Sequence, residues 1–202
     1  MTLPQPHDLL RVEPVSPLFR DAPAWVRASL RAAPWVVVRR DRSTPNRIPI
    51  GIRGLERWQR FPAVVSTAAV AETLSPPDLL DSADDLPDLA AAVALRRAAE
   101  VFAPTRLRWG PGGSVGFTLA SGVCVITPES DLDLVLTAHR VPPWPLLAEV
   151  REMLRALPAR VDVQLSLPMG GIAVDELLSG TDRVLVRTSD GPVLTDLAAL
   201  TR

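Results

Sequence analysis

Two carboxylates stand close together in a segment that otherwise has the composition of a buried strand. Asp131 and Asp133 flank Leu132, and three apolar residues follow at 134–136. Because side chains alternate along a strand, both aspartates should lie on the same face. Like charges this close repel unless a cation lies between them, and carboxylate oxygens are ligands for Mg²⁺ or Mn²⁺. The alternative is an edge strand with both acids in solvent, since Asp-x-Asp spacing is common.

A third carboxylate interrupts a later apolar stretch. Asp162 lies within the segment 161–165, whose other residues are two valines, a glutamine and a leucine. Burying a lone carboxylate without a partner costs several kcal/mol, so a partner is expected. If this strand pairs beside the strand of Asp131 and Asp133, all three acids can converge on one metal site.

A glycine-rich turn precedes the acids along the chain. Residues 109–114 read Trp-Gly-Pro-Gly-Gly-Ser and lie between an expected strand and an expected helix. The first amides of a helix are unpaired and carry the positive end of its dipole, so the turn predicts an anion site. Gly113 permits close approach of a phosphate, and the Ser114 hydroxyl can donate to it. An ordinary turn is the alternative.

Positive charge is concentrated in the first part of the chain. Residues 1–60 contain 11 arginines and 5 acids, whereas residues 61–202 contain 11 arginines and 18 acids, and there is no lysine. Arg53, Arg57 and Arg60 would share one face if residues 55–60 are helical. Such a row suits phosphate or carboxylate recognition, or it is simply a solvated face.

Periodicity and turn residues indicate the elements that must position these groups. Residues 34–40 and 48–53 are expected to form a hairpin of two strands after a helix at 24–30, and residues 75–88 to form a linker or exposed loop. The second part is expected to contain helices at 86–102, 115–121, 143–157 and 174–178, and strands at 106–109, around 131–136, at 160–165 and at 183–188. This alternation predicts an α/β (α+β) chain: a small, arginine-rich N-terminal α+β domain at 1–80, and a domain at 81–202 with a mixed sheet flanked by helices.

The order of these motifs resembles the nucleotidyltransferase fold of the DNA polymerase beta superfamily. There, Gly-Ser on a turn is followed by Asp-x-Asp on the next strand and a third Asp on a later strand. Within it, the chain resembles the phosphoribosyl-dephospho-CoA transferases, the malonate decarboxylase holo-acyl-carrier-protein synthases. The resemblance rests on 113–117, 121–122, 130–134 and 160–162, and in the first part on 7–10, 34–37, 51–54 and 59–60.

The resemblance implies transfer of 2′-(5″-triphosphoribosyl)-3′-dephospho-CoA to a serine of the apo acyl carrier protein of malonate decarboxylase, with release of diphosphate. It implies two Mg²⁺ (or Mn²⁺) ions on Asp131, Asp133 and Asp162, the last also a candidate base for the serine proton. Gly113 and Ser114 would hold the diphosphate. Arg53, Arg57 and Arg60 would bind precursor phosphates or dock the acidic carrier.

Two other functional classes stay open: a metal-dependent nucleotidyltransferase with a different protein or small-molecule acceptor, and a non-enzymatic carrier-binding module. Nucleic acid is not expected as a partner, because the second part is acidic and no long basic stripe with aromatics is present. No apolar run is long enough for a transmembrane helix, so no membrane partner is expected. The single cysteine, Cys124, cannot form an internal disulfide, which favours a cytoplasmic location.

Overall fold

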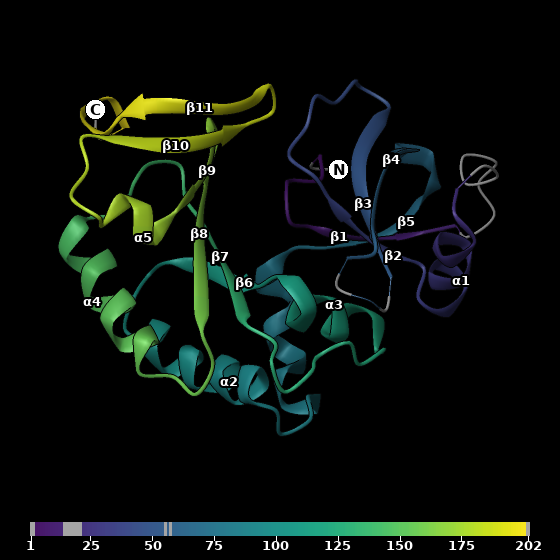
Figure 1. The fold of residues 1–202 in the computed structure, drawn as a ribbon, viewed down its shortest axis with the longest axis horizontal. Coiled ribbons are helices and arrows are strands. Elements are labelled where there is room, and N and C mark those ends of the chain that lie inside the picture. The colour runs from purple at the N-terminus through teal and green to yellow at the C-terminus, as the bar shows by residue number, and fades with distance from the viewer. Residues whose placement is uncertain (1–2, 14–21, 55, 57, 201–202) are drawn as a thin grey trace.

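The computed structural model describes residues 3–13, 22–54, 56 and 58–200, which form two β-sheets side by side (Figure 1). The first sheet is antiparallel, in the order β4-β3-β2-β1-β5. Its strands are β1 (Leu9–Val12), β2 (Trp35–Val38), β3 (Arg47–Arg53), β4 (Arg60–Ser66) and β5 (Val70–Leu74). Helix α1 (Ala24–Ala32) precedes β2, and the 3₁₀ helix η2 (Thr67–Ala69) joins β4 to β5.

The second sheet has the order β11-β10-β9-β8-β7-β6. Its strands are β6 (Arg108–Pro111), β7 (Leu132–Thr137), β8 (Val161–Leu167), β9 (Gly170–Ala173), β10 (Arg183–Thr188) and β11 (Gly191–Asp196). The helical elements of this part are η3 (Pro76–Asp85, 3₁₀), α2 (Ala90–Phe102), α3 (Gly113–Ser121), α4 (Trp144–Arg155), α5 (Val174–Leu177) and α6 (Leu197–Leu200). Among the described strands of this sheet, only β7 and β8 pair in parallel, with α4 as the crossover, so the sheet is mixed as expected.

The central strands of the first sheet bury residues on both faces, against different neighbours. Leu10 and Val36 pack in one cluster with Val26 and Leu30 of α1. The alternate residue Trp35 instead belongs to a cluster with η3 and α3, which lie between the two sheets. Because side chains alternate along each strand, one face of the first sheet packs against α1, and the other face packs against the second part of the chain.

One face of the second sheet is covered by α2 and α4. Leu132, Leu134 and Leu136 of β7 are at most 1% exposed and share one cluster with alternate residues of β8 and with both helices. The residues between these leucines, Asp133 among them, must point to the opposite face. The apolar alternation of the strand is thus what turns its acid away from the helices.

The segment 75–88 is not the exposed linker that its composition suggested. Residues Pro76–Asp85 form η3, which begins with two prolines and a capping box between Ser75 and Asp78. Leu79 is buried between the sheets, and Pro76 packs so closely on β6 that a Cβ on Gly110 would lie 2.1 Å from its carbonyl carbon. Proline and aspartate start this helix, although the same residue types are also typical of loops.

The fold class and most of the expected elements are confirmed, including the hairpin of β2 and β3. The sequence did not predict β1, β4, β5, β9 or β11, which are short or lie toward the sheet edges. The division of the chain at residue 80 stays a prediction. Within the described ranges, no helix has the length and apolar character needed to cross a membrane.

Candidate active site

The aspartates of β7 and β8 lie next to each other. The parallel register pairs Asp133 with Asp162, and both residues alternate with buried leucines or valines that face the helices. They therefore share the sheet face opposite α2 and α4. Because β7 pairs with β6 on its other side, the expectation of an edge strand is wrong, although the Asp133 side chain is exposed to solvent.

Asp131 lies one residue before β7 and is half-buried. The strand begins at Leu132, whose amide donates to the carbonyl of Arg160 at 2.9 Å. In the described part of the chain, no three His, Cys, Asp or Glu side chains are grouped so that they could hold a metal ion. The structure thus brings Asp133 and Asp162 together by register, while the three-carboxylate metal site stays a prediction.

The Gly-Ser turn lies directly beside Asp133. The Gly112 amide donates to the Asp133 carbonyl at 2.8 Å, which ties the start of α3 to β7. Gly113 has φ +54°, and a Cβ built on it would lie 1.8 Å from Oδ2 of Asp133. Position 113 thus requires glycine for two reasons: the backbone is left-handed, and the Asp133 carboxylate occupies the space that a Cβ would need. Ser114 follows and is buried at 8% exposure.

A cation from the other sheet reaches this acid. Arg53, the last residue of β3, is half-buried, and its Nε is without a hydrogen-bond partner. Burial and the neighbouring Arg60 lower the pKa of Arg53 to about 10, while Asp133 acts in the opposite direction. Arg53 stays charged at neutral pH, so the face that bears Asp133 also receives a guanidinium from the first sheet.

The expected helical row of arginines is wrong for Arg60. Arg53 and Arg60 face each other as register partners where β3 and β4 meet, so they are joined across a hairpin. Arg60 Nη1 donates to the carbonyl of Gln59 at 3.0 Å. Arg57 lies outside the described residues. Arg53 and Arg60 are therefore neighbours, as expected, but they are brought together by antiparallel strand pairing and not by a shared helix face.

Asp162 has a partner that the sequence reading did not identify. Arg160 Nε donates to its Oδ1 at 3.1 Å, and Arg160 Nη2 forms an ion pair with the same oxygen at 3.0 Å. The two residues are separated by Val161, so they point to the same side of the chain. The Arg-x-Asp spacing on a predicted strand could have indicated this ion pair from the sequence. Because the pair is largely exposed, it contributes little to stability and can rearrange when a ligand binds.

The arrangement combines two adjacent carboxylates, the amino end of a nine-residue helix and a partly desolvated arginine. Carboxylates suit a hard divalent cation, and the helix terminus and guanidinium suit phosphate oxygens. A site of this kind is suited to a polyphosphate that carries a metal ion.

Comparison with known proteins gives the same family over both parts of the chain. Residues 5–76 match the Phosphoribosyl-dephospho-CoA transferase MdcG N-terminal domain, and residues 78–198 match the corresponding C-terminal domain. A phosphoribosyl-dephospho-CoA transferase of Pseudomonas aeruginosa is 42% identical over 192 residues, which cover 95% of this chain and 91% of the relative. Proteins with the same name from Pseudomonas syringae pv. tomato and Klebsiella pneumoniae are 39% and 36% identical, covering 92% and 95% of this chain and 89% and 94% of their own. No solved structure matches the sequence.

Proposed function

The chain belongs to the phosphoribosyl-dephospho-CoA transferase family, and on that premise we propose that it modifies the apo acyl carrier protein of malonate decarboxylase. The donor is 2′-(5″-triphosphoribosyl)-3′-dephospho-CoA, and the acceptor is a serine hydroxyl. One observation carries the proposal: Asp133 and Asp162 are register partners beside Gly113, at the amino end of α3. This places carboxylates and anion-binding amides around one point, as phosphoryl transfer requires.

The proposed reaction is an in-line displacement. The serine Oγ attacks the α-phosphorus of the triphosphate, the bond from that phosphorus to the β-bridging oxygen breaks, and diphosphate leaves. A phosphodiester then joins the serine to the phosphoribosyl group. Arg160 holds Oδ1 of Asp162, so we assign the other carboxylate oxygen, Oδ2, to take the serine proton.

The donor set fits divalent cations, because Asp133 and Asp162 present oxygen ligands on one face and Asp131 is two residues away from Asp133. Mg²⁺ or Mn²⁺ bound by these three residues would neutralise charge on the attacking and leaving oxygens. The chain's own groups do the rest. Amides at Gly113 and Ser114 bind the leaving diphosphate, and Arg53 neutralises the remaining phosphate charge.

The placement of Arg53 supports a role with the precursor over docking of the carrier protein. Its pKa responds to Asp133, so the guanidinium lies within electrostatic reach of the acids. A half-buried arginine is also better placed for a small ligand than for a protein surface. From the single cysteine we further propose a reducing, cytoplasmic location.

The direct test is mass spectrometry of apo acyl carrier protein after incubation with the enzyme, the precursor and Mg²⁺. A mass gain equal to the phosphoribosyl-dephospho-CoA group, together with release of diphosphate, is the expected result. Nucleoside triphosphates are tested in parallel. Modification from those donors, with none from the precursor, would replace this proposal by a nucleotidyltransferase with another substrate.

A further inference from the structure

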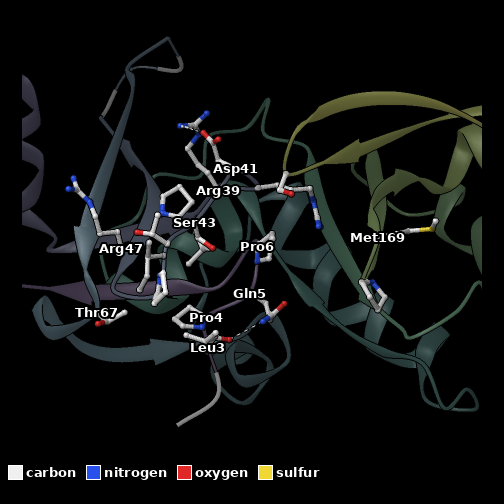
Figure 2. A pocket seen from close by; sticks show the side chains of 18 residues that line it. Leu3, Pro4, Gln5, Pro6, Arg39, Asp41, Ser43, Arg47, Thr67 and Met169 are labelled. Carbon is white, nitrogen blue, oxygen red and sulfur yellow. Dashed lines mark hydrogen bonds and ion pairs between the residues drawn. The ribbon is translucent and has the colours of Figure 1, made fainter.

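A cavity of about 530 Å³ lies where the two sheets meet, away from the acids (Figure 2). One wall is the N-terminal segment at 3–6 together with the β2–β3 hairpin. The other wall comes from the turn between β8 and β9, at Pro168 and Met169, and from Ser189. In Figure 2, Pro4, Gln5 and Pro6 lie on one side of this space and Met169 lies on the other. Neither Asp133 nor Asp162 lines it, so the cavity is a separate part of the molecule.

The walls combine positive charge with apolar surface. Arg39, Arg40 and Arg47 line the cavity, and its one lining acid, Asp41, is paired with Arg39 at 3.5 Å. Much of the remaining wall is apolar: Leu3, Pro4, Pro6, Ile48, Pro49 and Met169. A ligand with an anionic group at one end and a weakly polar chain at the other would match both kinds of surface.

Arg40 is the cavity cation that is also held by the second sheet. Its Nη2 donates to Ser166 Oγ at 2.9 Å, but its Nε is buried and lacks a hydrogen-bond partner. Burial lowers the pKa of Arg40, because the guanidinium is held partly away from water. The Nε lies near Gly171, which does not line the cavity, but Arg40 itself does, so the rest of its guanidinium can bind a phosphate oxygen there.

The sheet face that carries Asp162 extends along β8 toward the cavity. Ser166 is on β8, on the same face as Asp162 and four residues further along, which corresponds to about 13 Å at the usual strand rise. Arg40 joins the cavity wall to Ser166, so one sheet face leads from Asp162 to the cavity. The proposed precursor has two charged groups: the reacting triphosphate and, beyond two linked riboses, the diphosphate that carries pantetheine.

We propose that this cavity binds the diphosphate and pantetheine arm of the dephospho-CoA moiety, with Arg40 on the diphosphate and the proline-rich wall against the arm. The inference rests on the proposed function for the identity of the donor. It assigns the junction of the two sheets a role in substrate binding, because each sheet provides one wall. The acids then act on the triphosphate end of the same molecule.

Calorimetric titration with dephospho-CoA and with ADP tests the cavity without any transfer step. Dephospho-CoA is expected to bind at least about tenfold more tightly than ADP, because only it carries the arm. Arg40→Gln should weaken both ligands by about tenfold, since it removes the cation from the diphosphate. Ser43→Trp fills the cavity from an exposed position and should weaken dephospho-CoA to a similar extent. Arg97→Gln and Ser82→Trp, both at exposed positions outside the cavity, are matched controls and should change neither affinity.

Equal affinity for dephospho-CoA and ADP would overturn the inference, as would unchanged binding in Ser43→Trp. Thermal denaturation checks whether Arg40→Gln is folded. If it is not, Ser43→Trp still tests binding in the cavity, because the substituted position is exposed. Transfer kinetics separate this inference from the proposed function. A normal KM for the precursor in an active Ser43→Trp enzyme would refute the cavity alone. Selective dephospho-CoA binding without any transfer to the carrier would refute the reaction alone.

Discussion

Asp133 is the residue at which the most features of the site meet. It is opposite Asp162 in the sheet, its carboxylate lies over Gly113, and its charge affects Arg53. Its neighbours Leu132 and Leu134 are fully buried on the other face, which fixes the direction of the side chain. Removing its charge should therefore affect chemistry far more than folding.

Asp133→Asn should lower transfer to the carrier protein by at least about 100-fold, because an amide cannot replace a carboxylate that holds a cation on the phosphates. Initial rates followed by mass spectrometry measure the effect, and thermal unfolding should be close to that of the wild type. Asp84→Asn, at an exposed position on η3, is the control and should be fully active. A near-normal rate in Asp133→Asn would refute the proposed role of this carboxylate.

Arg53→Ala should raise the KM for the precursor by about tenfold, because a partly desolvated guanidinium loses its contact with phosphate. Stability should not fall, since the change also removes the repulsion between Arg53 and Arg60. Arg53→Lys keeps the charge but not the planar fork, so it should restore only part of the affinity. An altered KM for the carrier protein with a normal KM for the precursor would instead indicate a docking role.

At the scale of elements, the start of α3 is bound to β7 by the Gly112 amide and by the space that Gly113 leaves for a carboxylate. The helix ends at Gly122, which also has a positive φ, +69°, but has no atom within 4 Å of a Cβ position. The two ends of one helix thus share the same backbone requirement and differ in their surroundings.

This difference allows a controlled test of the turn. Gly113→Ala and Gly122→Ala should each lose about 1 kcal/mol of unfolding free energy, measured by denaturant titration, from left-handed backbone strain. Only Gly113→Ala should also lose most of its transfer activity, because its methyl group would displace the Asp133 carboxylate. Equal activity in the two variants would show that the close approach at Gly113 is unimportant for the reaction.

At the scale of the whole molecule, two adjacent titratable residues lie near the junction of the sheets. Burial and the nearby Arg40 lower the pKa of His7 from 6.5 to about 4. Burial raises the pKa of Asp8 from 3.8 to about 6; the hydrogen bond from the Gln5 amide and Arg108 oppose this shift, and Asp78 adds to it. Folding therefore favours the neutral form of both residues.

The two shifts should act on stability with opposite signs. As pH falls from about 6.5 to about 4, protonation of His7 favours the unfolded chain, whereas protonation of Asp8 from about 6 to 3.8 favours the folded one. The contributions nearly cancel in the wild type. Asp8→Asn should uncover the His7 effect, so that unfolding free energy drops between pH 6.5 and 4. His7→Gln should show the reverse slope. Denaturant titrations at several pH values measure both, and parallel curves for the two variants would contradict the assignment.

Local sequence patterns are sufficient to predict the order of the elements around the acids. Alternating apolar residues, helical periodicity and a glycine-rich turn are local patterns, so β6, α3, β7, α4 and β8 were predicted in the right order. Local patterns also misled: Pro76–Asp85 form the helix η3, and Arg53 and Arg60 pair across a hairpin. Capping residues and loop residues are the same types, and only burial of Leu79 between the sheets decides between the two structures.

Tertiary structure decided everything that depends on register and on contacts between distant segments. The pairing of Asp133 with Asp162, the carboxylate above Gly113 and the reach of Arg53 from the first sheet each join residues with no fixed spacing in sequence. The cavity at Arg40 exists only because two sheets meet there. Periodicity specifies which face a side chain takes, but packing of whole elements specifies what lies opposite that face.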